Sequence, residues 1–268
     1  MPRLAIIGGT GVYDPKMLNG VREETVNTRY GSVTVKIGTY ENKEVAFLAR
    51  HGETHAAPPH KVNYRANILA LKELGVEKVI ATAATGSLNL EMRPGDFVLI
   101  DQFIDFTKSR PQTFYDDGEQ GVVHIDMTDP YCNEVRSVLA KAGQVLNINI
   151  YHKGTYICTE GPRFETPAEI KMYSHMGGDL VGMTSVPEVV LAREAEMCYA
   201  TIATVTNFAA GISPTPLTHA EVLEAMNNTN ENLKKLIMQA VLIMPEERKC
   251  ACRTALGELG SLGQKKGD

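Results

Sequence analysis

The chain has 268 residues, of which 43% are hydrophobic, and its formal net charge at pH 7 is −5. This length allows one large α/β domain or two small ones, and the acidic balance argues against a nucleic-acid or membrane-surface partner. No apolar run approaches the roughly 20 residues of a membrane span. Residues 1–7 are too short an apolar stretch before Gly8 and Gly9 to form a signal peptide. The five scattered cysteines fit a reducing compartment, so we expect a cytoplasmic protein.

The first predicted strand ends in a glycine turn. Residues 4–7 are apolar, and the Gly8-Gly9-Thr10-Gly11 that follows resembles a phosphate-binding turn, because glycines let backbone N–H groups approach an anion. Thr10 adds a hydroxyl that can donate to the same anion. The turn is not G-x-G-x-x-G and no Gly-Lys-Ser/Thr follows, which excludes the Rossmann and Walker motifs. An ordinary turn after a first strand is the alternative.

The segment Arg50-His51-Gly52-Glu53-Thr54-His55 follows a strand pair that we predict over 33–37 and 45–48. An arginine is well suited to bidentate phosphate binding. The segment resembles a zinc-protease signature, but its glutamate is misplaced and it leads into Pro58-Pro59 rather than lying on a helix. We therefore favour phosphate and sugar contacts over zinc, with a solvated basic loop as the other possibility.

A helix and a strand come next. Helical spacing over 62–74 ends at Gly75, and residues 78–82 form a strand. This strand ends in Ala83 and Ala84, and small residues at that point leave room for a ligand against the backbone.

A long polar segment without any period, residues 109–121, lies between a strand over 97–100 and a helix over 133–142. Structureless segments of this length are commonly functional. His124 lies just after it.

A strand–turn–helix junction follows the β-rich run 153–159. Gly161-Pro162 ends the strand, and Thr166 with Glu169 forms a capping box for the next helix. Junctions of this kind in α/β proteins commonly bind ligands.

Phe164 and Glu165 lie side by side within this junction. An aromatic ring can stack on a flat heterocycle, and a carboxylate can accept hydrogen bonds from the N–H edge of that heterocycle. The alternative is an ordinary loop with a core phenylalanine and a surface glutamate.

The last third of the chain adds two strands and two helices. In order, they are a strand ending at 181, a helix beginning at Pro187, a strand over 199–206 and an amphipathic helix over 220–243 that Pro245 stops. Polar residues lie between these elements at Gly182-Met183-Thr184, at Asn207 and at His219.

The chain contains no internal repeat and no linker before residue 245, so we expect one domain over 1–245. Residues 246–268 are basic and glycine-rich, and we expect them to fray or to dock on a neighbouring chain. Within this tail, Cys250-Ala251-Cys252 allows a small strained disulfide, a metal site with other ligands, or no role at all.

The alternation of strands and helices predicts the α/β class. Several strands end in a polar or glycine-rich cluster, namely at Thr10, Arg50, Ala84, Phe164 with Glu165, Thr184 and Asn207. If these ends converge, they form one site with an anion corner, an apolar middle and a corner for a flat heterocycle.

These clusters resemble the motifs of the trimeric purine nucleoside phosphorylases and methylthioadenosine phosphorylases. The matching pieces run from residue 4 to about 240, in the right order; they are Ile6-Ile7-Gly8-Gly9-Thr10-Gly11, Arg50-His51-Gly52, Val62-Asn63-Tyr64-Arg65-Ala66-Asn67, Asp101-Gln102-Phe103-Ile104-Asp105, Glu160-Gly161-Pro162-Arg163-Phe164 and Gly182-Met183-Thr184. The resemblance implies a central mixed, twisted sheet that forms a distorted barrel flanked by helices. It does not cover the tail after Pro245.

The resemblance implies reversible phosphorolysis of a purine nucleoside to a free base and ribose 1-phosphate. Inorganic phosphate is then a co-substrate, and neither a metal nor another cofactor is expected. The family also implies a homotrimer, with two trimers stacking into a hexamer left open. Catalysis would rest on orientation and electrostatic stabilisation as the C1′–N9 bond stretches and negative charge grows on the purine.

The resemblance assigns roles to particular residues. The catalytic residues would be Asn207, Glu165 and His51, and the phosphate pocket would contain Thr10, Arg50, His51, Ala83, the backbone N–H of Ala84, and Thr184. Ala83 departs from relatives that carry Thr or Asn there, so one hydrogen bond to phosphate, about 1 kcal/mol, is expected to be missing. Met183 would lie under the ribose, Phe164 would stack on the purine, and His124 would reach into the site of the adjacent subunit.

Three positions predict which purine is bound. Asn207 replaces the aspartate of adenosine-type relatives, and its NH₂ can donate to a 6-oxo group while its carbonyl accepts a proton shared with N7. Glu165 replaces a small serine and can accept from the N1–H of hypoxanthine or guanine, which adenine lacks. Ala209 replaces a second acid that methylthioadenosine relatives carry, and this also favours a 6-oxopurine. We therefore expect a 6-oxopurine substrate.

His219 bears on the sugar. Methylthio-specific relatives have an apolar residue there, whereas a histidine can hydrogen-bond a 5′-hydroxyl, which favours inosine and guanosine; a solvent-facing helix residue is the alternative. His55 and the partner-chain His124 would lie near the same end. A methylthioinosine or methylthioadenosine phosphorylase is the first rival function, and a non-catalytic nucleoside- or nucleotide-binding protein is the second. A nicotinamide oxidoreductase is a distant third because the chain lacks G-x-G-x-x-G.

Overall fold

The computed structural model describes the chain except residues 10–11, 13–16, 53–55, 117–121, 214–215 and 258–268. The strands are β1 (Leu4–Gly8), β2 (Asn19–Thr28), β3 (Gly31–Tyr40), β4 (Lys43–Ala49), β5 (Lys78–Ser87), β6 (Phe97–Leu99), β7 (Gln102–Phe106), β8 (Ile150–Tyr151), β9 (Thr155–Thr159), β10 (Leu180–Gly182) and β11 (Cys198–Phe208). The helices are α1 (Tyr64–Glu73), α2 (Asn133–Leu146), α3 (Pro167–His175), α4 (Ser185–Glu194) and α5 (His219–Ile243), with 3-10 helices η1 (Pro59–Lys61) and η2 (Ala251–Thr254).

All the described strands belong to one mixed sheet, as the family resemblance implies. The order β2-β3-β4-β1-β5-β10-β9-β7 forms the main path, and β11 pairs with β5 and with β6, which in turn pairs with β8. The strands β4, β1, β5 and β11 are mutually parallel, while β2, β3 and β4 form antiparallel pairs. Glu41 and Asn42 join β3 to β4 with positive φ values, which suits a tight hairpin turn.

Strand β5 changes its neighbour halfway along its length. Its first residues, 78–81, pair with β1, whereas Gly86 and Ser87 pair with the antiparallel strand β10. The carboxyl ends of β1 and β10 therefore approach each other over the middle of β5, while β11 continues along the other side of β5. Ligands in α/β proteins bind where the strand order changes in this way.

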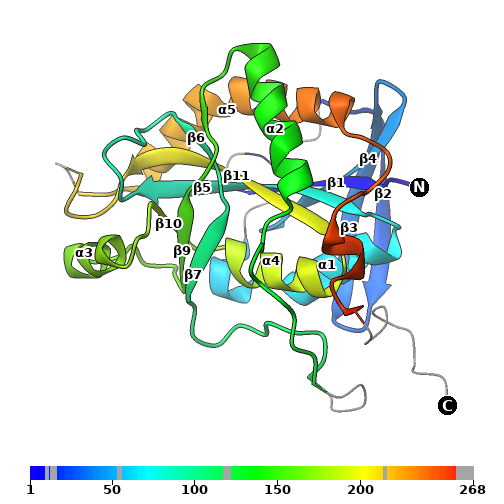
Figure 1. Ribbon diagram of the computed structural model, residues 1–268, viewed down its shortest axis with the longest axis horizontal. Helices are drawn as coiled ribbons and strands as arrows, with labels where there is room; N and C mark the ends of the chain where they lie inside the picture. Colours follow the sequence, from blue (N-terminus) through cyan, green and yellow to red (C-terminus); the bar gives the residue numbers. More distant parts are fainter. Residues whose placement is uncertain (10–11, 13–16, 53–55, 117–121, 214–215, 258–268) are drawn as a thin grey trace.

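The side chains of the strands alternate between two apolar layers. Along β1, for example, Ala5 and Ile7 belong to one buried cluster while Leu4 and Ile6 belong to the other. Helices α1 and α4 cover the first face and α2 and α5 cover the second, so the sheet lies between two helical layers (Figure 1). Burial on both faces explains why β1 has a continuous apolar run.

Three strands, β2, β7 and β8, were not predicted from the sequence. Strand β2 is exposed along most of its length, so it has no apolar face that a periodic pattern could show. Strand β7 is half-exposed and pairs with β9 at the far end of the main path. Among the described strands, the two-residue strand β8 pairs only with β6, so all three lie at the edges of the sheet, where packing imposes the weakest pattern on a sequence.

The described part of the tail, 246–257, differs from the expected fraying segment because it packs on its own chain. The Lys78 Nζ donates to the carbonyl oxygens of Pro245 and Glu246 at 2.7 and 2.8 Å. The Arg248 Nη1 donates to the Glu196 carbonyl at 2.7 Å, and Leu256 is buried. These contacts tie residues 246–257 to the β5–β11 end of the sheet. Among the described helices, none is long and apolar enough to cross a membrane.

Candidate active site

A cavity of about 530 Å³ opens where β1 and β10 meet over β5. Its walls come from the ends of β1, β4, β5, β10 and β11, from the segment before α3, and from the start of α5. The predicted residues in its lining are Arg50, His51, Ala83, Ala84, Phe164, Glu165, Met183, Thr184, Asn207, Ala209 and His219. The structure thus brings the described strand ends together at one cavity.

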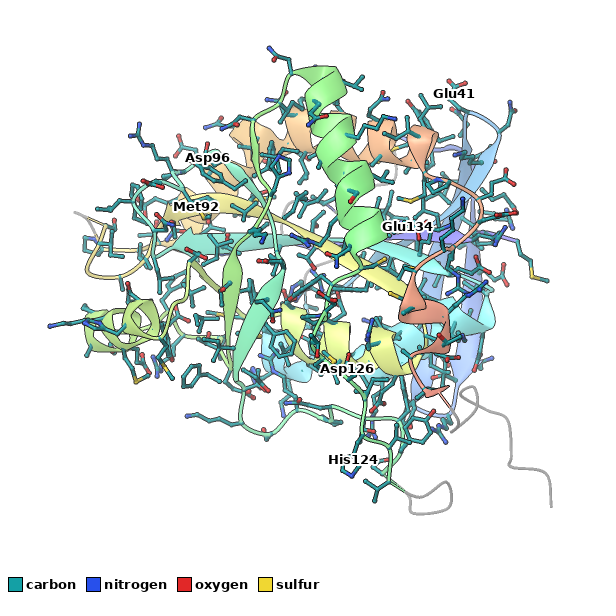
Figure 2. The ribbon with its side chains drawn as sticks, in the orientation of Figure 1. Glu41, Met92, Asp96, His124, Asp126 and Glu134 are labelled. Carbon is teal, nitrogen blue, oxygen red and sulfur yellow. The ribbon has the colours of Figure 1, made fainter. Side chains whose placement is uncertain are left out.

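The other three predicted residues are Thr10, His55 and His124. Thr10 and His55 lie outside the described residues. His124 lies on an exposed segment between the loop 109–121 and α2, at the lower edge of the molecule in Figure 2, and does not line the cavity.

Arg50 is buried at one end of the cavity, where Glu188 of α4 holds its guanidinium. The Nε and Nη2 atoms donate to the two Glu188 carboxylate oxygens at 2.6 and 2.7 Å, and Nη1 donates to the Thr82 carbonyl at 2.8 Å. Burial alone would lower the pKa of Arg50, but the Glu188 carboxylate outweighs it and raises the pKa. Of five guanidinium N–H groups, these bonds use three and fix the plane of the other two.

Glu188 escaped the sequence analysis although it is fully buried and also accepts a 2.6 Å hydrogen bond from the Tyr199 hydroxyl. A single glutamate in the first turn of a predicted helix is an ordinary feature, so no local pattern distinguishes Glu188. In the structure it cancels the charge of Arg50 and sets the direction of the guanidinium.

Gly9, directly after β1, leaves space for the Arg50 guanidinium because it has no side chain. A Cβ on Gly9 would lie 2.6 Å from the Thr82 carbonyl oxygen and 2.8 Å from the Arg50 Nη1. The Gly9 N–H donates to the Thr82 hydroxyl at 2.8 Å, so this amide is already used within the protein, in contrast to the anion contact expected of the turn. Gly9 therefore serves close packing against β5.

His51 and Thr184 complete this end of the cavity, and both are buried. The Nδ1 of His51 lies 2.8 Å from the Ala57 carbonyl oxygen, which requires a proton on Nδ1. Thr184 precedes α4, and its backbone N–H donates to the Tyr156 hydroxyl at 3.1 Å. The backbone at Val186 is non-helical, so the regular turns of α4 begin at Pro187, as the sequence predicts.

Glu165 lies at the other end of the cavity and is buried. Its carboxylate accepts a 2.7 Å hydrogen bond from the Thr159 hydroxyl at the end of β9. Burial raises the pKa of this carboxyl group, and the Thr159 hydrogen bond only partly offsets that effect. The predicted capping box of Thr166 and Glu169 is present and fixes the segment that carries Glu165 to the start of α3.

Asn207 lies at an irregularity in β11, where the pairing with β5 shifts between Val205 and Asn207. The Asn207 Oδ1 accepts from the Thr206 hydroxyl at 2.7 Å, and its Nδ2 donates to the Phe208 carbonyl at 2.9 Å. A Cβ on Gly86 would lie 3.3 Å from the Asn207 Nδ2, so glycine keeps space beside the amide. The shift in register turns the amide toward the cavity instead of into the sheet.

The remaining lining residues lie between the two ends or at the mouth. Phe164 is 38% exposed at the mouth, and Met183 contacts the turn at Gly161, where a Cβ would lie 2.5 Å from the Met183 sulfur. His219 is exposed at the start of α5, behind a capping box of Thr218 and Glu221. An aromatic ring, a thioether and an imidazole thus line the cavity in addition to its polar groups.

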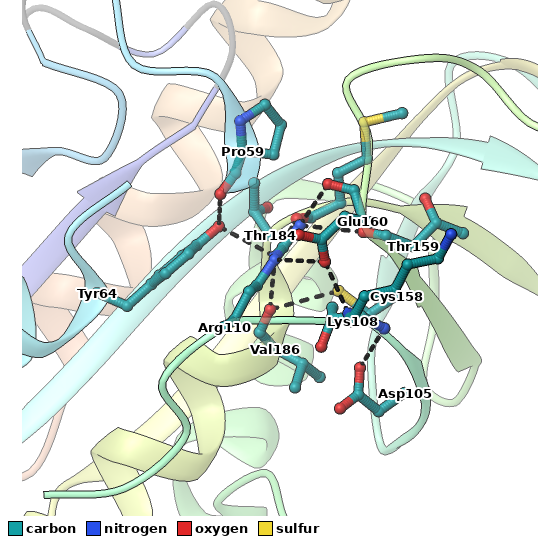
Figure 3. Close-up of polar contacts among 12 residues, drawn as sticks. Pro59, Tyr64, Asp105, Lys108, Arg110, Cys158, Thr159, Glu160, Thr184 and Val186 are labelled. Atoms are coloured by element: carbon teal, nitrogen blue, oxygen red, sulfur yellow. Dashed lines mark hydrogen bonds and ion pairs between the residues drawn. The ribbon is translucent and has the colours of Figure 1, made fainter. Parts of the chain in front are cut away.

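Arg110 joins two segments beside the cavity, and it was not predicted from the sequence. From the loop 109–116 its buried guanidinium donates to the carbonyl oxygens of Met183 at 2.6 Å, Val186 at 2.7 Å, Thr159 at 3.1 Å and Glu160 at 2.7 Å (Figure 3). It thereby joins the turn that carries Met183 and Thr184 to the end of β9. An arginine in a polar loop normally faces solvent, so nothing in the sequence marked it.

Comparison with known proteins agrees with this geometry. Residues 3–242 match a family described as the phosphorylase superfamily. The chain is 58% identical over 262 residues to the 6-oxopurine nucleoside phosphorylase of Pyrococcus furiosus, covering 96% of this chain and 98% of that protein. It is 50% identical over 253 residues to the probable S-methyl-5′-thioinosine phosphorylase of Methanocaldococcus jannaschii, covering 94% and 97%.

Solved structures share the fold. The methylthioadenosine phosphorylase from Schistosoma mansoni, solved with adenine, matches with a TM-score of 0.91 and 35% identity, and 97% of each chain is covered. The family match spans the strands and helices that build the cavity, and the sequence and fold comparisons agree. The chain therefore belongs to the phosphorylase superfamily.

Proposed function

We propose that this protein catalyses the reversible phosphorolysis of 6-oxopurine nucleosides, such as inosine and guanosine, to a free purine and ribose 1-phosphate. One observation carries the proposal: Glu165 and Asn207 line the same cavity as Arg50 and Thr184, with Arg50 beside Thr82 of β5 and Asn207 beside Gly86 further along that strand. The relatives named as 6-oxopurine nucleoside phosphorylases support the same reaction.

Glu165 and Asn207 supply the chemistry for reading a 6-oxopurine. The N1–H of hypoxanthine or guanine would donate to the Glu165 carboxylate, which is buried and gains from a donor. The Asn207 NH₂ would donate to the 6-oxo group, and its carbonyl would accept a hydrogen bond from N7–H once the departing base takes up a proton from solvent at N7. Adenine has no N1–H, so it would leave the buried carboxylate without that partner.

The opposite end of the cavity suits phosphate. The Glu188-bound guanidinium of Arg50 offers N–H groups in a fixed plane, and Thr184 adds a hydroxyl. His51, with Nδ1 donating to Ala57, and the backbone at Ala83 and Ala84 complete the pocket. Because Glu188 balances the charge of Arg50, the pocket would bind phosphate by directed hydrogen bonds more than by net positive charge.

The reaction then follows from the separation of the two ends. As the C1′–N9 bond stretches, the sugar gains oxocarbenium character and the purine gains negative charge, which hydrogen bonding at N7 by Asn207 would stabilise. Phosphate on the opposite side of the sugar would stabilise and then capture the cation. The protein's contribution is to hold both partners in line with the bond. Met183 would lie under the ribose and Phe164 would stack on the base.

The sugar preference rests on His219, which lines the cavity at the start of α5. An imidazole there would hydrogen-bond a 5′-hydroxyl, whereas a methylthio group would prefer an apolar slot. Methylthioinosine is the alternative substrate, because one relative is named as a probable S-methyl-5′-thioinosine phosphorylase. Val222 and Leu217 also line the cavity, so the 5′ end is only partly polar.

We also propose a homotrimer in which His124 of one chain reaches the cavity of the next, with a stack of two trimers as a further option. The support is that His124 is exposed and lies away from the cavity of its own chain. Phe164, at the mouth of the cavity, is partly exposed in the single chain.

Base release from inosine and guanosine, followed with and without inorganic phosphate, tests the proposal. Release that requires phosphate and yields ribose 1-phosphate is the expected result. Nucleoside binding in calorimetry without any base release at all would contradict the proposal and favour a binding protein.

A further inference from the structure

Four of the five cysteines gather at one place, far from the cavity. Cys132 precedes α2, Cys198 is the first residue of β11, and Cys250 and Cys252 lie in the tail. Their sulfur atoms all lie within 4.8 Å of one another, although the residues come from three separate segments. All four are free thiols, with Cys198 and Cys250 sulfurs 3.2 Å apart, well beyond the roughly 2.05 Å of a disulfide bond.

The spacing of these sulfur atoms matches four ligands of one tetrahedral ion. A zinc–sulfur distance of about 2.3 Å places tetrahedral sulfurs about 3.8 Å from one another. The sulfur of Cys250 lies 3.7 Å from that of Cys132 and 3.2 Å from that of Cys198. Small movements of side chains would therefore complete the tetrahedron. A set made only of thiolates selects zinc over hard ions such as magnesium or calcium.

The surroundings suit a negatively charged cluster. The Arg193 Nη1 donates to the Cys252 sulfur at 3.6 Å, and Lys78 is the pairing partner of Cys198 between β5 and β11. Cys132 lies at the amino end of the 14-residue helix α2, where the helix dipole favours a thiolate. Three of the four cysteines are buried, which keeps water from competing for the ion.

Contacts that involve no sulfur atom hold residues 245–250, where the tail begins, against α2 and β5. The Glu134 carboxylate, in the first turn of α2, accepts hydrogen bonds from the backbone N–H groups of Lys249 and Cys250 at 3.0 and 3.1 Å. Lys78 holds the carbonyl oxygens that precede this segment. The Cys250-Ala251-Cys252 turn is thereby directed at the start of β11.

We propose that Cys132, Cys198, Cys250 and Cys252 form a structural zinc site that clamps the tail to α2 and β11. Each thiol that ligates the ion releases its proton to solvent, and four sulfur ligands leave no open position for catalysis. The site lies at the beginning of β11 and Asn207 near its end, about 30 Å apart along the strand. The proposal is therefore independent of the phosphorolysis reaction.

Cobalt titration of the full chain, purified without oxygen and with reductant, tests the site. Thiol counting first verifies that the cysteines are reduced. We expect one Co²⁺ per chain, with the sulfur-to-cobalt absorption of a tetrahedral tetrathiolate, and displacement of the cobalt by one equivalent of Zn²⁺. We also expect added zinc to raise the Tm of the reduced protein.

Matched variants locate the site. Cys252→Ser and Cys132→Ser should each weaken cobalt binding at least tenfold and abolish the zinc-dependent rise in Tm. Cys158→Ser is the control, because Cys158 is buried in β9 away from the cluster and should leave binding unchanged. Base release measured below each Tm should be retained in Cys252→Ser, so failure of the site and failure of the proposed reaction give different results.

Two results would overturn the zinc site. A fully reduced chain that takes up no cobalt at one equivalent rules it out, as does equal binding by wild type and Cys252→Ser. If air-oxidised protein then shows two disulfides by mass, the cluster is a pair of redox cross-links instead.

Discussion

Asn207 and Glu165 act at the scale of single hydrogen bonds, and the account of base selection depends on them. Asn207→Asp keeps the acceptor for the Thr206 hydroxyl but replaces the donor opposite purine position 6. We expect kcat/KM for inosine to fall by about 10- to 100-fold, equivalent to one lost hydrogen bond at a buried group, and adenosine to gain. Steady-state kinetics on both nucleosides measures the shift.

The control for this variant is Asn147→Asp, the same substitution at the left-handed end of α2. It should leave kcat/KM unchanged for both inosine and adenosine. An unaltered inosine-to-adenosine ratio in Asn207→Asp would remove Asn207 from base reading.

Glu165→Gln separates the binding role of the carboxylate from its effect on stability. Because burial raises the pKa of Glu165, the folded state disfavours the charged form. This group therefore stabilises the fold below its unfolded pKa, and that contribution is lost as pH rises through the raised folded pKa. At neutral pH the glutamine variant should have a higher Tm than wild type, but a lower kcat/KM for inosine by about 10- to 100-fold.

The pH dependence of inosine turnover gives a second test of Glu165. Protonation would remove the acceptor for purine N1–H, so kcat/KM should fall at acid pH, at a higher pH than for an ordinary glutamate. The acid limb should be absent in Glu165→Gln. An acid limb that is identical in the variant would assign the titration to another group.

At the scale of elements, the site depends on close packing between strands and on Arg110. Gly9→Ala would push a methyl group against the Thr82 carbonyl and the Arg50 guanidinium. We expect the KM for phosphate to rise about tenfold or more, in line with the loss of a charge-assisted hydrogen bond, while the KM for inosine changes little. Phosphate and inosine titrations of initial rates separate these effects.

Gly86→Ala is the matched comparison for Gly9→Ala, because its Cβ would approach Asn207 at the base end instead. It should alter base selectivity before it alters the phosphate KM. If both variants change the same constant, the two ends of the cavity are not separate sites.

Arg110→Lys tests whether the buried guanidinium positions the site. Lysine keeps the charge but cannot reach the four carbonyl oxygens that Arg110 contacts in two adjacent turns. Leaving such groups without partners should lower the free energy of unfolding by about 2–4 kcal/mol. The KM for inosine should rise as Met183 loses its support. The exposed Arg93→Lys is the control, and a wild-type Tm in Arg110→Lys would contradict this role.

The elements show why part of this site could be predicted from the sequence. Strand ends such as Arg50 and Asn207 carry polar residues directly after apolar runs, and that contrast is visible in one dimension. Glu188 contacts Arg50, 138 residues away, and Arg110 contacts backbone carbonyls 49 to 76 residues away, which no local pattern encodes. The exposed strand β2 was missed for a related reason, because nothing buried imposes a period on it.

At the scale of the whole molecule, the account requires an assembly of three chains. Light scattering should give a mass of about 88 kDa, three times 29.3 kDa, because the proposed site takes His124 from an adjacent chain. Mixing offers a sharper test. Chains with His124→Ala and chains with Asn207→Ala should each be weakly active, whereas co-expressed mixtures should regain activity at sites with both residues intact. A mixture no more active than its components would exclude a shared site.

The measurement that tests the central claim most directly is kcat/KM for inosine, guanosine, adenosine, methylthioinosine and methylthioadenosine, each with and without phosphate. The account predicts phosphate-dependent turnover that is fastest for inosine and guanosine, because Glu165 and Asn207 select the 6-oxopurine and His219 the 5′-hydroxyl. Fastest turnover of methylthioinosine would keep the base argument and reject the role of His219. Fastest turnover of methylthioadenosine would contradict the selection of the base by Glu165 and Asn207.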